Sequence, residues 1–282
     1  MCKILSFAQK IILLYSILMN YMKKLTLLLI ATLFIFTGCQ YEKLLKSRNY
    51  KLKYQKALEY YNEEDYTRAE GLFEQLKPVM RPTAQGDTVH FYSAYANYYN
   101  RNYQLAGHYF EEFYNIYGNS SFAEEAEFMA SYCYYQLSPR PSLDQAYTKK
   151  AINDFTLYLS RHPQTKRRTQ VLTLINELKN KLVEKSYMGA KLYYKLEDYK
   201  ASIIALNNSL EQFPQTSYRE EIMYMLVRSR FLYAENSVED KRKERYQETL
   251  DEYISFANEF PESEYMSEVK DYYNKANRVL QN

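Results

Sequence analysis

Three segments of the chain align with one another without a gap, and this internal repetition limits the possible folds more than any other feature. They read ALEYYNEEDYTRAEGLF at 57–73, AYANYYNRNYQLAGHYF at 94–110 and AKLYYKLEDYKASIIAL at 190–206. Each begins with Ala, has Tyr at its tenth place and ends on an apolar or aromatic residue. Repeated units of this kind gain stability mainly from the interfaces between neighbours, so the units are expected to stack.

The thirteenth place of each segment holds a small residue, namely Ala69, Ala106 or Ser202. Small residues there and at the first place allow two paired helices to approach closely, and the Tyr at the turn packs across both. The pattern resembles the tetratricopeptide repeat, a helix-turn-helix unit of about 34 residues.

Two looser units extend the array. One follows Ala130, with QLSPRPSLDQA inserted before its second helix, and the other pairs residues 222–233 with 246–260. Pro163, Pro214 and Pro261 occupy the closing place of three units, where a ring without an N–H stops a helix. We therefore predict an all-α fold for residues 50–282. It is an α-solenoid of about five tetratricopeptide-like helix pairs, and SEYMSEVKDYYNKANRVL forms a C-terminal capping helix.

The segment before residue 39 has the order of an export signal. Met22-Lys23-Lys24 is basic, Leu25 to Phe36 is uncharged, and Thr37-Gly38 provides small residues before Cys39. The apolar run is about a dozen residues, whereas a membrane-spanning helix needs roughly 20. Thr37-Gly38-Cys39 resembles the lipobox of bacterial lipoproteins, which implies that residues 22–38 are a signal peptide and that Cys39 carries lipid. Residues 39–49 are then a lipidated tether, and an ordinary cleaved signal is the alternative.

Residues 1–21 contain a second, shorter apolar stretch, Ile11 to Met19. We interpret them as an upstream extension and Met22 as the biological start. The alternative is a membrane anchor with two spans, although both stretches fall short of spanning length.

Charge and residue chemistry exclude several classes of function. Residues 1–38 hold four lysines and no acid, which leaves 33 basic and 34 acidic residues in the mature chain, without the basic excess of a nucleic-acid binder. The histidines His90, His108 and His162 lack metal spacing, and no phosphate loop or nucleophile motif is present. Cys133 reads as a buried thiol. We therefore predict a non-enzymatic protein with no cofactor, no metal and no nucleic acid.

A concave surface lined by the first helix of each pair is the candidate binding site. Counting three back and one, four and five on from the aligned Ala predicts the residues that face it. In the first two repeats these are Tyr54, Leu58, Tyr61, Asn62, Phe91, Tyr95, Tyr98 and Tyr99, followed later by Tyr134, Tyr187, Lys191 and Tyr194. Tyr provides contact area and a hydrogen bond at low entropic cost. The alternative is that these rings fill the packing between repeats, since the chain has 33 tyrosines.

A lipobox cysteine, a short tether and five repeats with FPxS/T endings together resemble the BamD-type lipoproteins of outer-membrane β-barrel assembly, over residues 39–282. The resemblance implies a lipid anchor on the periplasmic face of the outer membrane. It also implies two partners: the periplasmic domains of the barrel-forming assembly subunit, bound by the C-terminal repeats, and unfolded outer-membrane protein precursors, received by the N-terminal repeats.

Two rival functions stay open. A generic repeat adaptor of envelope complexes fits the same repeats. A SusD-type glycan-binding lipoprotein fits less well, because such proteins have long additional loops and usually use Trp for sugar stacking, and this chain has no Trp.

Overall fold

A computed structural model of the chain describes residues 40–281 together with Met19, Met22 and Lys24. Cys39 and the predicted signal peptide lie outside the described residues. Throughout the described part the chain forms helices joined by turns, with no strand. None of these helices is long and apolar enough to cross a membrane.

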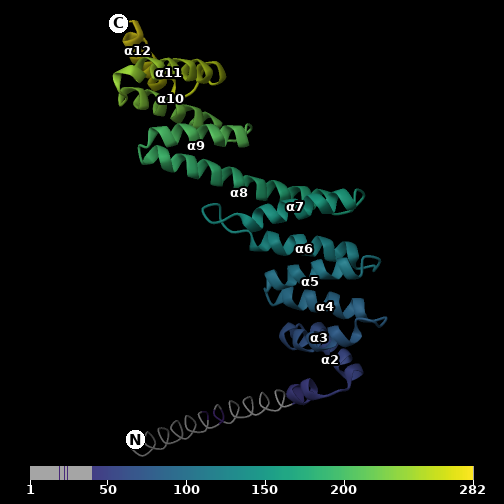
Figure 1. Ribbon diagram of the computed structural model, residues 1–282. Coiled ribbons are helices and arrows are strands. Elements are labelled where there is room, and N and C mark those ends of the chain that lie inside the picture. The colour runs from purple at the N-terminus through teal and green to yellow at the C-terminus, as the bar shows by residue number, and fades with distance from the viewer. Residues whose placement is uncertain (1–18, 20–21, 23, 25–39, 282) are drawn as a thin grey trace, which may run out of the picture. The chain divides into compact units, whose positions relative to one another are not determined.

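The chain divides into two compact units, one ending at Ala130 and the other beginning at Ser131. Within each unit, consecutive helices pack against each other in pairs (Figure 1). Unit 1 contains α2 (Tyr50–Asn62), α3 (Tyr66–Met80), α4 (Gly86–Tyr99), α5 (Tyr103–Ile116) and the first half of α6 (Ala123–Leu137). Unit 2 contains the rest of α6, α7 (Ala146–Arg161), α8 (Arg168–Lys195), α9 (Tyr199–Gln212), α10 (Arg219–Glu235), α11 (Glu239–Glu259) and α12 (Met266–Gln281).

One turn closes every helix pair. In it, the N–H of a Ser or Thr bonds the carbonyl three residues back, and its hydroxyl accepts the N–H two residues on. Thr216, for example, bonds the Phe213 carbonyl at 3.1 Å, and its Oγ1 accepts the Tyr218 N–H at 3.2 Å. The turn occurs at Thr83, Ser120, Thr165, Thr216 and Ser263. The turns at Thr216 and Ser263 are the FPxS/T endings of the sequence. Together, the five turns and the helices between them confirm the predicted all-α solenoid of five helix pairs, with α12 as the capping helix.

The turns inside the three aligned repeats also share one backbone geometry. Glu64, Arg101 and Glu197 occupy the eighth place of the aligned segments, and all three have positive φ, between 59° and 63°. The next residue donates its N–H to a carbonyl five residues back, as Asp65 does to Tyr60 at 2.8 Å. This is the Schellman ending of a helix, which usually has Gly at the left-handed position. The gapless alignment therefore holds at the level of the backbone.

The helix α8 is the longest of the described helices. It runs without a break for 28 residues and joins the end of the third repeat to the first helix of the fourth. Its first half buries Val171, Leu174, Ile175 and Leu178 at helical spacing, and its second half buries Tyr187 and Ala190. Its interior contains no Pro, and Gly189 lies in open space, so no residue ends the helix before Lys195.

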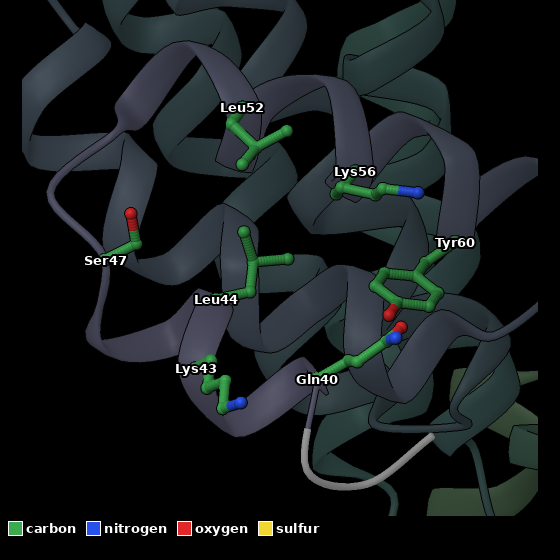
Figure 2. A pocket seen from close by; sticks show the side chains of 7 residues that line it. All are labelled: Gln40, Lys43, Leu44, Ser47, Leu52, Lys56 and Tyr60. Atoms are coloured by element: carbon green, nitrogen blue, oxygen red, sulfur yellow. The ribbon is translucent and has the colours of Figure 1, made fainter. Parts of the chain in front are cut away.

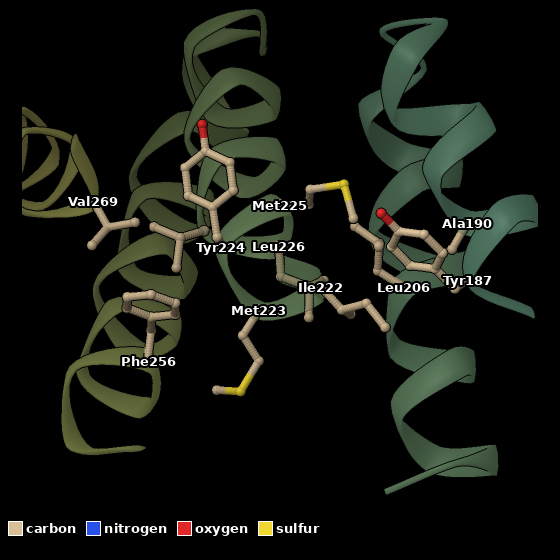
Figure 3. Close-up of a cluster of buried hydrophobic side chains, with 11 residues drawn as sticks. Tyr187, Ala190, Leu206, Ile222, Met223, Tyr224, Met225, Leu226, Phe256 and Val269 are labelled. Carbon is tan, nitrogen blue, oxygen red and sulfur yellow. The ribbon is translucent and has the colours of Figure 1, made fainter. Parts of the chain in front are cut away.

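The core of unit 2 is centred on α10. Its residues from Ile222 to Val227 are all buried, which marks a helix covered on every side. Figure 3 shows this cluster, with Tyr187, Ala190 and Leu206 from α8 and α9 on one side and Phe256 and Val269 from α11 and α12 on the other. α10 therefore links the fourth repeat to the capping helix.

The core of unit 1 forms where α2, α3 and α4 meet. Ala57, Ala69 and Ala96 are fully buried there, beside Leu72 and Phe73. Small side chains at the crossing allow the large ones to interdigitate. The predicted roles of Ala69 and Ala106 agree with their complete burial.

Candidate protein-binding surfaces

The predicted aromatic residues of the second repeat belong to a continuous group of rings in unit 1. Tyr99 stacks on Tyr66 with ring centroids 4.5 Å apart and lies 5.4 Å from Tyr98. Tyr98 contacts Tyr103 at 5.5 Å, and Tyr61 contacts Tyr66 at 5.4 Å. We call this group the Tyr band; it consists of Tyr61, Tyr66, Tyr95, Tyr98, Tyr99 and Tyr103.

The predicted residues differ in the fraction of each side chain that is exposed to solvent. Tyr99 is 46% exposed, whereas Tyr61, Tyr95 and Tyr98 are half-buried. Burial raises the pKa of the Tyr61 phenol. Phe91 is only 6% exposed, because its ring packs between Tyr95 and the rings of the next helices. Phe91 therefore contributes mainly to the core, and Tyr99 offers the largest accessible ring.

Two further predicted residues lie apart from this band. Tyr54 is half-buried at the edge of the α2–α4 core, where burial raises its pKa and Thr88 is a hydrogen-bond partner. Tyr134 belongs to unit 2 and is 7% exposed, with the Lys150 ammonium 4.2 Å from its ring centroid. No ring contact joins Tyr54 to the band among the contacts of the described residues.

A second feature recurs in both units and was not predicted. An aromatic residue on one helix stacks on the aromatic residue just before the helix that begins the following repeat or the capping helix. The pairs are Phe91 with Phe122 at 4.4 Å, Tyr187 with Tyr218 at 4.0 Å, and Tyr224 with Tyr265 at 4.2 Å, all within 18° of parallel.

Each stacked pair is followed by a glutamate that accepts a phenol hydrogen bond. Tyr95 donates to Glu125 at 2.5 Å, Tyr187 to Glu221 at 2.6 Å and Tyr224 to Glu268 at 2.9 Å. Each glutamate lies in the first turn of its helix, where the helix dipole favours negative charge. We call the stack and its glutamate the inter-repeat joint. Its sequence signal is an aromatic residue followed by Glu three places later, at 122–125, 218–221 and 265–268.

The residue four places after the stacked ring distinguishes the two units. In unit 1 it is Tyr95, whereas in unit 2 it is Lys191 or Arg228. Lys191 donates to Glu221 at 2.6 Å, and Arg228 lies 3.9 Å from Glu268 and bonds the Tyr224 hydroxyl at 3.3 Å. Burial opposes ionisation of Glu221, but hydrogen bonds from Lys191 and Tyr187 outweigh it and lower the pKa. The same joint is therefore aromatic in unit 1 and charged in unit 2.

The described residues provide little for catalysis or metal binding. No group of three His, Cys, Asp or Glu side chains among them could hold a metal ion. Cys133 is buried, and this burial raises the pKa of its thiol to about 12. A thiol that stays protonated at neutral pH is a poor nucleophile.

A comparison with protein families identifies the family of this chain. A family model, YfiO, described as an outer membrane lipoprotein, matches residues 47–221 and 186–281. The chain belongs to this outer membrane lipoprotein family. A comparison with curated proteins finds no match. The family and the helical repeats together indicate a repeat protein of the cell envelope.

Solved repeat structures resemble the chain only distantly. The TPR2AB domain of yeast Sti1, in its pHSP90 complex, is 15% identical, with coverage of 81% of this chain and 98% of that chain and a TM-score of 0.37. The TPR domain of P58(IPK) is 14% identical, with coverage of 85% and 68% and a TM-score of 0.40. A tetratricopeptide repeat protein from Parabacteroides merdae is 12% identical, with coverage of 80% and 99% and a TM-score of 0.34. The chain's own helices and turns define its fold.

Proposed function

We propose that this lipoprotein is a non-enzymatic subunit of the machinery that assembles β-barrel proteins in the outer membrane. Lipid on Cys39 anchors it to the periplasmic face. Unit 1 binds unfolded barrel precursors, and unit 2 binds the barrel-forming assembly subunit through its periplasmic domains. The observation that carries the proposal is the match of the outer membrane lipoprotein family over residues 47–281.

The chemistry of the Tyr band suits an unfolded precursor. A strand of a membrane barrel exposes an apolar side chain at every second residue, and a row of rings can hold such a strand by burial without reading its sequence closely. Because the bound segment must become ordered, much of the contact energy is offset and the affinity is modest. Modest affinity suits a site that passes its cargo on.

The charged joints suit a folded partner. Lys191, Glu221, Arg228 and Glu268 place both signs of charge on one series of joints within unit 2. Complementary charges fix how a folded partner is oriented and disfavour binding of other proteins. Their effect on affinity is smaller. A generic repeat adaptor would have the same fold, so the identity of the partner is what must be tested.

The deciding experiment is a pull-down of the native protein from detergent-solubilised membranes. Recovery of the barrel-forming assembly subunit is expected. Recovery of a carbohydrate porin in its place would support the glycan-binding alternative and contradict the proposal. A Cys39→Ser variant in the same cells should carry no label from a palmitate analogue. It should also leave the membrane fraction, because the acyl chains on Cys39 are its main membrane anchor.

Precursor binding can be separated from subunit binding with two variants. Replacing Tyr98 and Tyr99 together by Ala should weaken binding of a precursor C-terminal peptide, measured by fluorescence anisotropy, by about tenfold, which corresponds to about 1.4 kcal/mol. Tyr193→Ala in unit 2 is the matched control, since Tyr193 is 43% exposed. Equal peptide affinity in a folded double variant would show that these rings serve packing only.

A further inference from the structure

The segment that directly follows Cys39 is strongly basic. Residues 40–56 carry one acid, Glu42, and six basic side chains, namely Lys43, Lys46, Arg48, Lys51, Lys53 and Lys56. Without this segment, residues 57–282 hold 27 basic and 33 acidic residues. Positive charge is therefore concentrated at the end of the chain that bears the proposed lipid.

This basic segment is fixed to unit 1. Residues 40–46 are helical, and the Tyr41 hydroxyl donates to the Arg68 carbonyl at 3.1 Å while its ring meets the Tyr60 ring edge-on at 5.8 Å. The buried Lys53 donates to the Leu45 carbonyl at 2.9 Å and so holds the end of this short helix. Lys53 therefore points inward, and the other five basic side chains stay at or near the surface.

A pocket of about 340 Å³ lies between residues 40–46 and α2. Figure 2 shows Leu44, Leu52 and Tyr60 in its lining together with the two ammonium groups of Lys43 and Lys56. Leu52 is 40% exposed and so presents apolar surface to the pocket. Lys56 is bonded to Glu59 at 2.6 Å, and an ammonium has three donors, so it can bind a second anion.

We infer that this pocket binds one anionic phospholipid of the membrane, with its phosphate attracted by the ammonium groups of Lys43 and Lys56 and the start of an acyl chain on Leu44 and Leu52. The inference rests on the proposed lipidation of Cys39, because Gln40 in the pocket wall is the next residue and one residue spans less than 4 Å. The volume of the pocket is in the range of small-ligand pockets. Basic side chains near an anionic bilayer add electrostatic attraction, which complements a lipid anchor.

The site also orients the protein on the membrane. Residues 40–56 are attracted to an anionic surface, while the acidic remainder of the chain is repelled by it within a Debye length. A lipid held beside the anchor thus gives unit 1 a second attachment to the membrane.

The test is native mass spectrometry of the mature lipoprotein, purified in detergent and titrated with phosphatidylglycerol, with phosphatidylcholine of the same acyl chains, or with inorganic phosphate. Phosphatidylglycerol should bind at least about tenfold more tightly than phosphatidylcholine. The Lys43→Glu, Lys56→Glu double variant should reduce that binding about tenfold or more. Lys241→Glu with Lys243→Glu on α11 is the control and should leave it unchanged.

Several results would overturn the inference. These are equal binding of the two lipids, no loss in the Lys43/Lys56 variant while circular dichroism shows it folded, or full competition by inorganic phosphate at equal concentration. Leu52→Ser should weaken the lipid but not phosphate, and no effect on the lipid would remove the acyl part of the site. The intact mass of the same sample reports whether Cys39 carries lipid, so failure of the anchor and failure of this pocket are told apart.

Discussion

Unit 1 and unit 2 use the same joint between repeats and differ in the side chain that completes it. In both, an aromatic stack of 4.0–4.4 Å is followed by a glutamate in the first turn of the next helix. Tyr95 reaches that glutamate in unit 1, and Lys191 or Arg228 does so in unit 2. The backbone thus repeats the joint in both units, and one position in each joint sets whether the side chain that reaches the glutamate is aromatic or charged.

In both units, the paired helices are expected to cross closely at their small buried residues. Ala106→Leu in unit 1 should lower the free energy of unfolding by about 1 to 3 kcal/mol, because Ala106 is fully buried and the crossing has no room for a larger side chain. The measurement is thermal unfolding by circular dichroism. Gln104→Leu, on the exposed face of the same helix, is the control and should have little effect. An unchanged melting curve for Ala106→Leu would show that the register of the second repeat is wrong.

The second prediction separates the units by pH. His90 in unit 1 is buried, which lowers its pKa, and its Nδ1 lies 2.8 Å from the Gly86 carbonyl oxygen. Because the unfolded chain takes up the proton near the ordinary value of 6.5 and the folded chain does so only at lower pH, stability is lost as the pH falls below 6.5. The loss is up to about 1.4 kcal/mol per pH unit until the folded pKa is reached.

Thermal unfolding at pH 7.5 and 5.5 measures this effect. The wild type should lose more stability between the two values than His90→Gln, in which the amide can still donate to Gly86. His108→Gln is the control, since His108 is exposed on α5. An equal pH dependence in wild type and His90→Gln would contradict the assignment of the effect to His90.

Much of the fold could be predicted from the sequence because its signals are local. The three aligned segments and the closing prolines determine turns, and turns are set by a few neighbouring residues. The closing prolines could not predict the length of α8, because none lies within 168–195 and the helix there packs against both α7 and α9. For the site, helical spacing predicted that Tyr98 and Tyr99 share one face with Phe91, and Tyr99 is exposed. The spacing could not give the burial of Phe91, which depends on Phe122 from the next repeat.

The third prediction tests the charged joint. Glu221→Gln should lower the free energy of unfolding by about 1 kcal/mol, because Lys191 loses its anionic partner. The cost stays small because both charges are partly exposed and water screens them. The carboxyl pKa of Glu221 is lowered in the folded chain. Its contribution is therefore complete above the ordinary value of 4.5 and is lost as the pH falls through the lower folded pKa.

Comparison with Glu125→Gln makes this prediction specific to unit 2. Tyr95 donates from an uncharged phenol, so the cost in unit 1 should be smaller and nearly independent of salt, whereas the cost of Glu221→Gln should shrink at high salt. Glu220→Gln, one residue before Glu221, is the control. Equal costs and equal salt dependence in the two units would mean that Lys191 does not distinguish the joints.

The smallest predicted change in stability concerns the turn with a positive-φ residue that both units share. Glu64 and Arg101 in unit 1 and Glu197 in unit 2 have φ near +60°, a conformation that costs an L-residue roughly 1 to 2 kcal/mol. Gly avoids that cost but loses more backbone entropy on folding, so each substitution by Gly should raise stability by only about 0.5 to 1 kcal/mol. Urea unfolding of the three single variants measures the gain, and Glu63→Gly, one residue earlier with φ of −81°, is the control that should destabilise. A gain in Glu64→Gly and Arg101→Gly without one in Glu197→Gly would show that the turn of unit 2 is supported differently, and the two units would then differ in backbone as well as in side chains.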